Sequence, residues 1–132
     1  MELLHKELTD EIIKTFFDVY NELGYGFLEK VYQNSLYIEL KSRGFYVEAQ
    51  KQIKVHYKGI EVGEYYADLI VNDLIILELK AADVLVKEHE WQLINYLRGT
   101  NIEVGLLLNF GIKPEFRRKV FDNTRKKRLE HR

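Results

Sequence analysis

Three charged residues occur where the sequence is otherwise apolar. Asp68 lies within the run 67–71, and Glu78 and Lys80 lie at the end of the next run, 74–80. Charged side chains are costly in apolar surroundings unless they are paired or bound to a metal. Because side chains alternate along a strand, Glu-x-Lys places Glu78 and Lys80 on one face. Two carboxylates and an ammonium there could hold Mg²⁺ and position a water molecule. A salt bridge is the alternative, since Glu-x-Lys is a frequent pattern.

Whether Asp68 shares that face depends on the turn between the two strands. If Asp68 lies opposite Glu78, residues 72–74 form a three-residue turn, which is a common hairpin length. A two-residue turn at 72–73 would instead pair Asp68 with Leu77 and send the two acids to opposite faces. We expect the three-residue turn, or a bulge with the same effect.

The elements that must position these residues follow from hydrophobic periodicity and turn residues. Helices are predicted at about 9–23, 28–42 and 87–97, and from Pro114 into the C-terminal tail. Strands are predicted at 46–57, 60–71, 74–79 and 104–108. The order α-α-β-β-β-α-β-α indicates an α/β fold of the α+β type, with a central mixed β-sheet flanked by helices. The strand at 74–79 is predicted to be central, because residues 74–77 are apolar on both faces.

Composition indicates one globular domain over residues 1–132 and excludes several kinds of site. The chain has no cysteine, so disulfides, thiolate metal sites and cysteine nucleophiles are excluded. The four histidines show no metal-binding spacing. No segment approaches the roughly 20 apolar residues that cross a bilayer, and no signal peptide is visible. We therefore expect a cytoplasmic protein with no membrane partner.

The charge is unevenly distributed. The formal net charge is −1, but residues 113–132 hold nine Lys/Arg against three Asp/Glu, a net of +6 that leaves −7 for residues 1–112. Residues from about 113 to 132 are predicted to form a basic C-terminal helix or tail. Such a tail could lie along phosphates, or it could be a solvated terminal helix kept soluble by its charges.

Three short motifs occur in order along the chain. Residues 26–32 read Gly-x-x-Glu-x-x-Tyr, Asp68 stands ten positions before the tripeptide 78–80, and residues 92–96 read Gln-x-x-x-Tyr. The first resembles the signature that names the GxxExxY protein family. The second resembles the core signature of the PD-(D/E)XK nuclease superfamily, with Ala67 where Pro is expected, a departure that many members share. The third resembles the motif of the RecB-like branch. The resemblance covers about residues 8–121 and implies a restriction-endonuclease-like fold.

The resemblance implies a nuclease that uses Mg²⁺ or Mn²⁺. Asp68 and Glu78 would bind the metal, helped by the backbone carbonyl of Leu79, and Glu29 would add an acidic ligand from the second helix. Lys80 would orient the attacking water and offset charge on the scissile phosphate. The implied partner is nucleic acid, DNA in preference to RNA.

Four further residues support the site in this interpretation. Gln92 and Tyr96 lie one turn apart on a helix and would steady Lys80 and the nucleic-acid backbone. Gly26 would let the chain turn into the second helix, and Tyr32 lies one turn beyond Glu29. Each has an ordinary structural alternative: both tyrosines as core rings with a hydrated hydroxyl, and Gln92 as an exposed helix residue.

A second function remains open. The chain could be a non-catalytic nucleic-acid-binding or protein-interaction module on a nuclease-like scaffold, since fold does not determine function. The acidic body favours this module, and a complete set of three acids and a lysine disfavours it. A homodimer is a further hypothesis, because paired cuts in a duplex need two sites. Trp91 and Tyr37 are expected to pack rather than to stack on bases.

Overall fold

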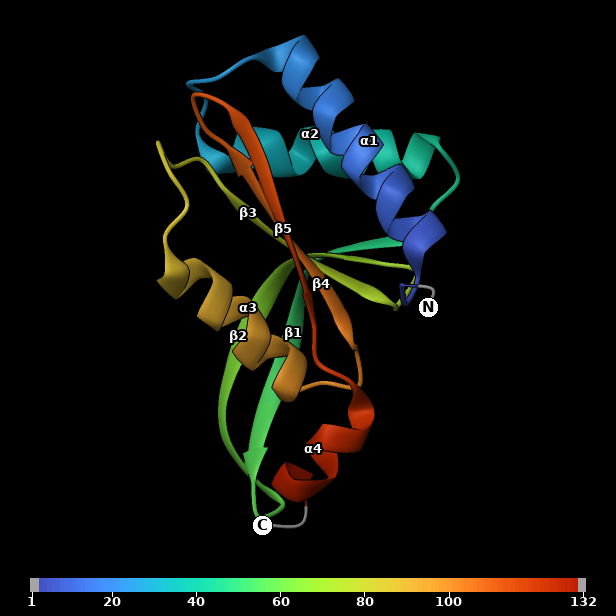
Figure 1. Cartoon of the computed structure of the whole chain (residues 1–132), viewed down its shortest axis with the longest axis vertical. Helices are drawn as coiled ribbons and strands as arrows, with labels where there is room; N and C mark the ends of the chain where they lie inside the picture. The colour runs from blue at the N-terminus through green and yellow to red at the C-terminus, as the bar shows by residue number, and fades with distance from the viewer. Residues whose placement is uncertain (1–2, 131–132) are drawn as a thin grey trace.

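The protein folds around one strongly twisted five-stranded sheet (Figure 1). The structure is a computed structural model that describes residues 3–130. The elements are α1 (Lys6–Leu23), α2 (Glu29–Ser42), β1 (Val47–Tyr57), β2 (Ile60–Val71), β3 (Ile75–Lys80), α3 (Lys87–Arg98), β4 (Val104–Phe110), β5 (Pro114–Val120) and α4 (Asn123–Glu130). The strand order is β1-β2-β3-β4-β5. The predicted mixed sheet flanked by helices is thus confirmed.

The central strand is β3, as the sequence predicts. It pairs antiparallel with β2 and parallel with β4, and its first five residues are buried. Its pairing with β2 includes Leu69–Leu77 and Val71–Ile75, so residues 72–74 form the expected three-residue turn. One further step in this register sets Asp68 opposite Glu78.

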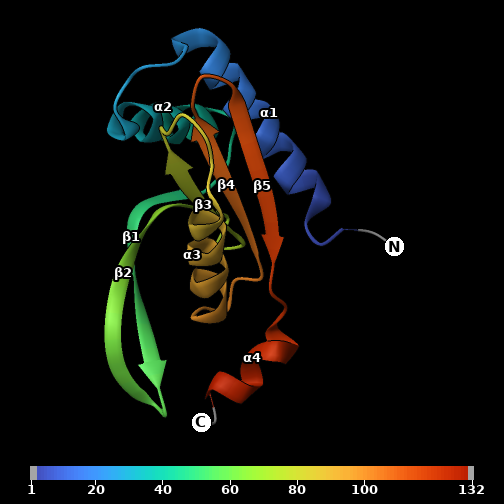
Figure 2. The same ribbon diagram turned by 60° about the vertical axis from the view of Figure 1, so that its left-hand side comes forward.

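Each face of the sheet carries its own apolar core. Helices α1 and α2 cover one face (Figure 2), where Phe16, Tyr32 and Phe110 are fully or almost fully buried. Helix α3 covers the other face, where Leu93 and Leu97 pack against residues of β2, β3 and β4. Two helical layers therefore shield the sheet, which explains why β3 reads as an uninterrupted apolar run.

The β1–β2 hairpin extends well past the rest of the sheet and curves around α3 (Figure 2). Its end is the turn Lys58-Gly59, where both residues have positive φ, 52° and 79°. Within β1, Gln50 also has positive φ, 52°, and the pairing of β1 with β2 omits Gln50 and Asp68. The ladder is therefore interrupted at Asp68.

The C-terminal region differs from the prediction. Residues 114–120 form β5, antiparallel to β4 at the sheet edge, and the helix predicted to begin at Pro114 begins at Asn123. Proline suits the first helical turn, but it suits the start of an edge strand equally well. The order is therefore α-α-β-β-β-α-β-β-α, and the basic helix is confined to α4. No helix within residues 3–130 is both long and apolar enough to cross a membrane.

Candidate active site

The carboxylate of Asp68 lies where the pairing of β1 with β2 is interrupted. Its Oδ2 accepts a hydrogen bond of 2.8 Å from the backbone N–H of Leu79 on β3. Because this bond joins β2 to β3 just beyond their last paired residues, it holds the carboxylate beside Glu78. Leu79 thus contributes its N–H to Asp68, whereas the role predicted for its carbonyl stays a prediction.

Glu78 is a nearly buried carboxylic acid. The residue is 6% exposed, and its Oε1 has no hydrogen-bond partner among the described residues. Burial, and after it the nearby carboxylate of Asp68, raises the pKa of Glu78 to about 9. Lys80 opposes this shift, so its ammonium lies within electrostatic reach of Glu78. Without a cation, Glu78 therefore keeps its proton at neutral pH.

The segment after Lys80 is held by one buried side chain. Asn109 on β4 accepts a hydrogen bond of 3.0 Å from the N–H of Ala82 and donates one of 2.8 Å to the Ala82 carbonyl. Asn109 is fully buried, so this pair of bonds directs the chain as it leaves β3. The sequence does offer a signal for this role, because Asn109 is a polar residue within an otherwise apolar strand.

Helix α3 places two predicted residues over the same face of the sheet. The ring of Tyr96 stacks on Tyr65 of β2, with centroids 3.6 Å apart, and the Tyr65 hydroxyl donates to the Tyr96 carbonyl. Burial, and after it the charge of Glu78, raises the pKa of Tyr96, while a hydrogen bond with Gln92 lowers it. Glu78, Tyr96 and Gln92 therefore form one neighbourhood, with Tyr65 as a member not identified from the sequence.

Two glutamines connect α2 to Asp68, and neither was identified from the sequence. The Nε2 of Gln50 donates to Oε1 of Gln33 at 2.7 Å and lies 3.4 Å from Oδ1 of Asp68. Gln33 is 6% exposed, whereas Gln50 is exposed, so the pair links a buried amide on α2 to an exposed amide on β1. Gln50 contacts both partners from a backbone position with positive φ, and no sequence pattern predicts a positive φ there.

The N-terminal motif builds the turn before α2. The buried Tyr32 hydroxyl accepts a hydrogen bond from the Phe27 N–H and donates one of 2.7 Å to the Gly24 carbonyl. Gly26 has φ 113°, which a residue with a side chain rarely adopts. The motif's glycine and tyrosine thus set the entry into α2, where Glu29 occupies the first turn.

Glu29 itself is exposed and is not grouped with the other two acids. Among the side chains that the structure describes, no three from His, Cys, Asp or Glu are grouped closely enough to hold a metal ion. Glu29 precedes Gln33 by four residues, so the two lie on the same side of α2. The structure thus brings together Asp68, Glu78, Lys80, Gln92 and Tyr96, and leaves Glu29 one helical turn from the amide pair.

The donors at the centre fit a hard divalent cation. They are carboxylate oxygens, and Oε1 of Glu78 is buried without a partner in the described chain. Mg²⁺ binds through one or two carboxylates plus water and substrate phosphate, so two acids are enough to begin such a site. A cation at this point would replace the proton that Glu78 otherwise keeps.

Comparisons with known proteins agree with this geometry. A family model described as the PD-(D/E)XK nuclease superfamily matches residues 6–119. The crystal structure of SSO0001 matches with a TM-score of 0.53 and 20% sequence identity. That match covers 76% of this chain and 54% of the other, so this chain spans about half the length of that protein, and the likeness concerns the fold alone. No curated protein matches.

Proposed function

Because the chain belongs to the PD-(D/E)XK nuclease superfamily, we propose that it is a nuclease that hydrolyses phosphodiester bonds with Mg²⁺ or Mn²⁺. DNA is the proposed substrate, ahead of RNA. The observation that carries the proposal is the buried Oε1 of Glu78, which has no hydrogen-bond partner among the described residues and lies beside the carboxylate of Asp68. A protein has little reason to keep two acids together in an apolar sheet unless a cation joins them.

Each residue of the site has a role in this proposal. Asp68 and Glu78 hold the cation, with the carbonyl of Leu79 as a further ligand. Glu29 supplies a third carboxylate from α2; its exposed side chain lies on the same side of the helix as Gln33, which is linked to Asp68 through Gln50. A bound Mg²⁺ polarises the phosphate and lowers the pKa of a water molecule.

The remaining residues act on the substrate and the water. Lys80 orients the attacking water and offsets the charge that develops on the scissile phosphate. Gln92 and Tyr96 steady Lys80 and the nucleic-acid backbone from α3. Membership of the GxxExxY branch, a homodimer and a cytoplasmic place of action remain predictions.

Cleavage of labelled oligonucleotides tests the proposal. We expect Mg²⁺- or Mn²⁺-dependent cleavage of single-stranded, duplex or branched DNA, and a loss of roughly 100-fold or more in Asp68→Asn and Lys80→Ala. Asp73→Asn is the matched control, because Asp73 is an exposed acid in the turn between the same two strands. Equal cleavage by Asp68→Asn and the wild type would overturn the catalytic assignment.

One observation favours a second function, a non-catalytic nucleic-acid-binding or protein-interaction module. In the described chain no third acidic side chain is grouped with Asp68 and Glu78. If hydrolysis here needs a third carboxylate, the site would bind nucleic acid without cutting it. Salt-dependent binding of DNA with no cleavage in Mg²⁺ or Mn²⁺ would support this module.

A further inference from the structure

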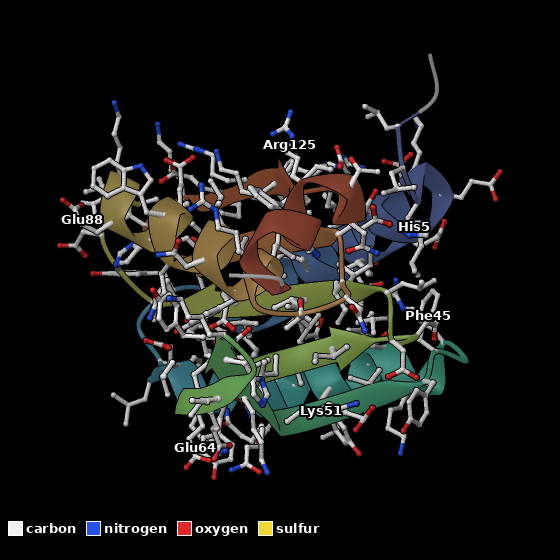
Figure 3. The ribbon with its side chains drawn as sticks, turned by 90° about the horizontal axis from the view of Figure 1, so that it is seen from below. His5, Phe45, Lys51, Glu64, Glu88 and Arg125 are labelled. Atoms are coloured by element: carbon white, nitrogen blue, oxygen red, sulfur yellow. The ribbon has the colours of Figure 1, made fainter. Side chains whose placement is uncertain are left out.

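Two hollows follow one another along the exposed side of α3. The first, of about 430 Å³, is lined by Glu88, His89, Trp91, Gln92, Asn95 and Tyr96. The second, of about 610 Å³, lies between the end of α3 and the β1–β2 hairpin, and its lining includes Lys54, His56, Asn95, Arg98 and Asn101. Asn95 lines both, so the two hollows adjoin, and we call them together the α3 groove. Figure 3 shows α3 beside the hairpin, with Glu88 marking the outer end of the helix.

The first hollow presents an aromatic ring to solvent. Trp91 is 58% exposed, contrary to the expectation that it packs. It adjoins Gln92 in sequence and shares the hollow with Tyr96, both members of the site neighbourhood. An exposed aromatic face next to a proposed phosphodiesterase site suits a nucleic-acid base, because every base has a π-face that stacks on such a ring.

The second hollow presents positive charge. Its lining includes Lys54 and Arg98 and contains no Asp or Glu. Lys54 also forms an ion pair of 3.7 Å with Glu61, and the Arg98 guanidinium lies over the ring of Phe121. Basic side chains along a groove are the usual contacts for a phosphate backbone.

The order of these features fits a single strand of nucleic acid rather than a duplex. Trp91, Asn95 and Arg98 recur at helical spacing on one side of α3, and the rise from Trp91 to Arg98 is roughly 10 Å. That length corresponds to about three nucleotides of a stacked strand. Stacking on Trp91 requires a base whose face is uncovered, which a base inside a duplex does not offer.

We propose that the α3 groove binds one unpaired strand of the nucleic-acid substrate. A base stacks on Trp91, and the phosphates that follow contact Arg98 and Lys54. Between these contacts the strand passes Gln92 and Tyr96, and so the site around Glu78. The inference rests on the proposed function, which it deepens by naming an unpaired strand as the substrate class.

The fluorescence of Trp91 tests this directly, because Trp91 is the only tryptophan in the chain. Wild-type protein with EDTA would be titrated with a thymidine oligonucleotide of about 12 nucleotides and with a duplex of equal length. We expect saturable quenching by the single strand and much weaker quenching by the duplex. Equal quenching by both, or none by either, would overturn the inference.

Binding of the labelled single strand by variants provides the second measurement. Trp91→Ala should weaken binding roughly 10-fold or more, and Arg98→Ala several-fold, with a smaller salt dependence for Arg98→Ala. Tyr46→Ala is the matched control, because Tyr46 is a similarly exposed aromatic, 57%, that does not line the groove. Trp91→Ala binding as tightly as wild type would contradict the inference.

The two proposals fail separately. Quenching without cleavage in either Mg²⁺ or Mn²⁺ would support the groove and contradict the catalytic assignment. Cleavage by the wild type with an unchanged KM in Trp91→Ala would leave the nuclease standing and remove the groove.

Discussion

At the scale of single residues, the site depends on how two carboxylates are kept together in an apolar sheet. Asp68 satisfies one oxygen with the Leu79 N–H, while Glu78 leaves Oε1 buried without a described partner. Without metal the pair is accommodated by a proton on Glu78, since burial and Asp68 raise its pKa to about 9. The stability of the metal-free protein must therefore depend on pH.

Replacing Glu78 by Gln should remove that dependence. The ordinary pKa of the group is 4.5, so between pH 4.5 and about 9 the folded state holds a proton that the unfolded state has lost. Metal-free wild type should thus lose stability as the pH rises through this window, by at most about 1.4 kcal/mol per pH unit relative to Glu78→Gln. Urea unfolding in EDTA measures both proteins, and parallel pH profiles would contradict the assignment.

Gln50 should affect the metal more than the fold. Gln50→Gly removes the amide that joins Gln33 to Asp68, but glycine adopts the positive φ more readily than Gln does. We expect the free energy of unfolding to change little, and Mn²⁺ affinity to fall about 10- to 100-fold, as when a residue that orients a metal ligand is lost. Gln50→Asn, which tolerates positive φ better than most residues, serves as the comparison. Unchanged Mn²⁺ affinity in Gln50→Gly would show that the amide does not position Asp68.

At the scale of elements, the site requires α3 to lie close on β4. A Cβ built at Gly105 of β4 would lie 2.6 Å from Cδ1 of Leu93, so α3 touches the strand there with no space to spare. Gln92 adjoins Leu93, and Tyr96 is one turn farther on. The contact between Leu93 and Gly105 therefore determines how far Gln92 and Tyr96 lie from the sheet. Glu29 is positioned in a similar way by the turn before α2, which the Tyr32 hydroxyl holds through two hydrogen bonds.

Gly105→Ala should displace α3. We expect a loss of about 1–3 kcal/mol of stability from overpacking, together with reduced cleavage, because Gln92 and Tyr96 move with the helix. Adding Leu93→Ala should restore part of the activity by making room. Gly63→Ala is the control, since a Cβ at Gly63 meets nothing within 4 Å, and its effect should stay within about 0.5 kcal/mol. Thermal unfolding of the four proteins measures their stability, and oligonucleotide cleavage measures their activity. Equal stability of Gly105→Ala and wild type would contradict the close packing of α3 on β4.

At the scale of the whole molecule, the basic C-terminal region leads from β5 into α4, which contacts β1 of the β1–β2 hairpin. Residues 113–132 carry a net charge of +6 within a chain of net −1. Helix α4 contacts β1, and its first turns are tied to the loop after α3, where Asn123 donates to the Asn101 carbonyl. Arg125 points away from the ribbon into solvent (Figure 3). The second hollow of the α3 groove is lined by residues of the hairpin and by Asn101, to which Asn123 of α4 is bonded.

Charge reversal at the two ends should therefore have unequal effects. Arg125→Glu should weaken single-strand binding about 5- to 10-fold at low salt and reduce the salt slope by about 1. Lys41→Glu is the matched control on α2, because Lys41, like Arg125, is a basic side chain held over an aromatic ring. We expect less than a roughly twofold change for it. Anisotropy titrations at several salt concentrations decide this, and equal losses in both variants would contradict the proposed path.

Much of this arrangement could be predicted from the sequence, because it depends on local patterns. The three-residue turn at 72–74 follows from placing Asp68 opposite Glu78, and the central position of β3 follows from its two apolar faces. Residues whose roles depend on distant partners were missed. Gln50 matters only through a positive φ and contacts to α2, and β5 could not be distinguished from a helix until its pairing with β4 was known.

A calorimetric titration with Mn²⁺ of wild type and Asp68→Asn shows whether the two carboxylates hold a metal ion. We expect saturable binding near one ion per chain in the wild type and its loss in a folded Asp68→Asn. Because substrate phosphate completes many such sites, the titration is repeated with a non-cleavable single strand. Binding of equal strength in both proteins, or none in the wild type even with the strand present, would contradict a metal site at Asp68 and Glu78.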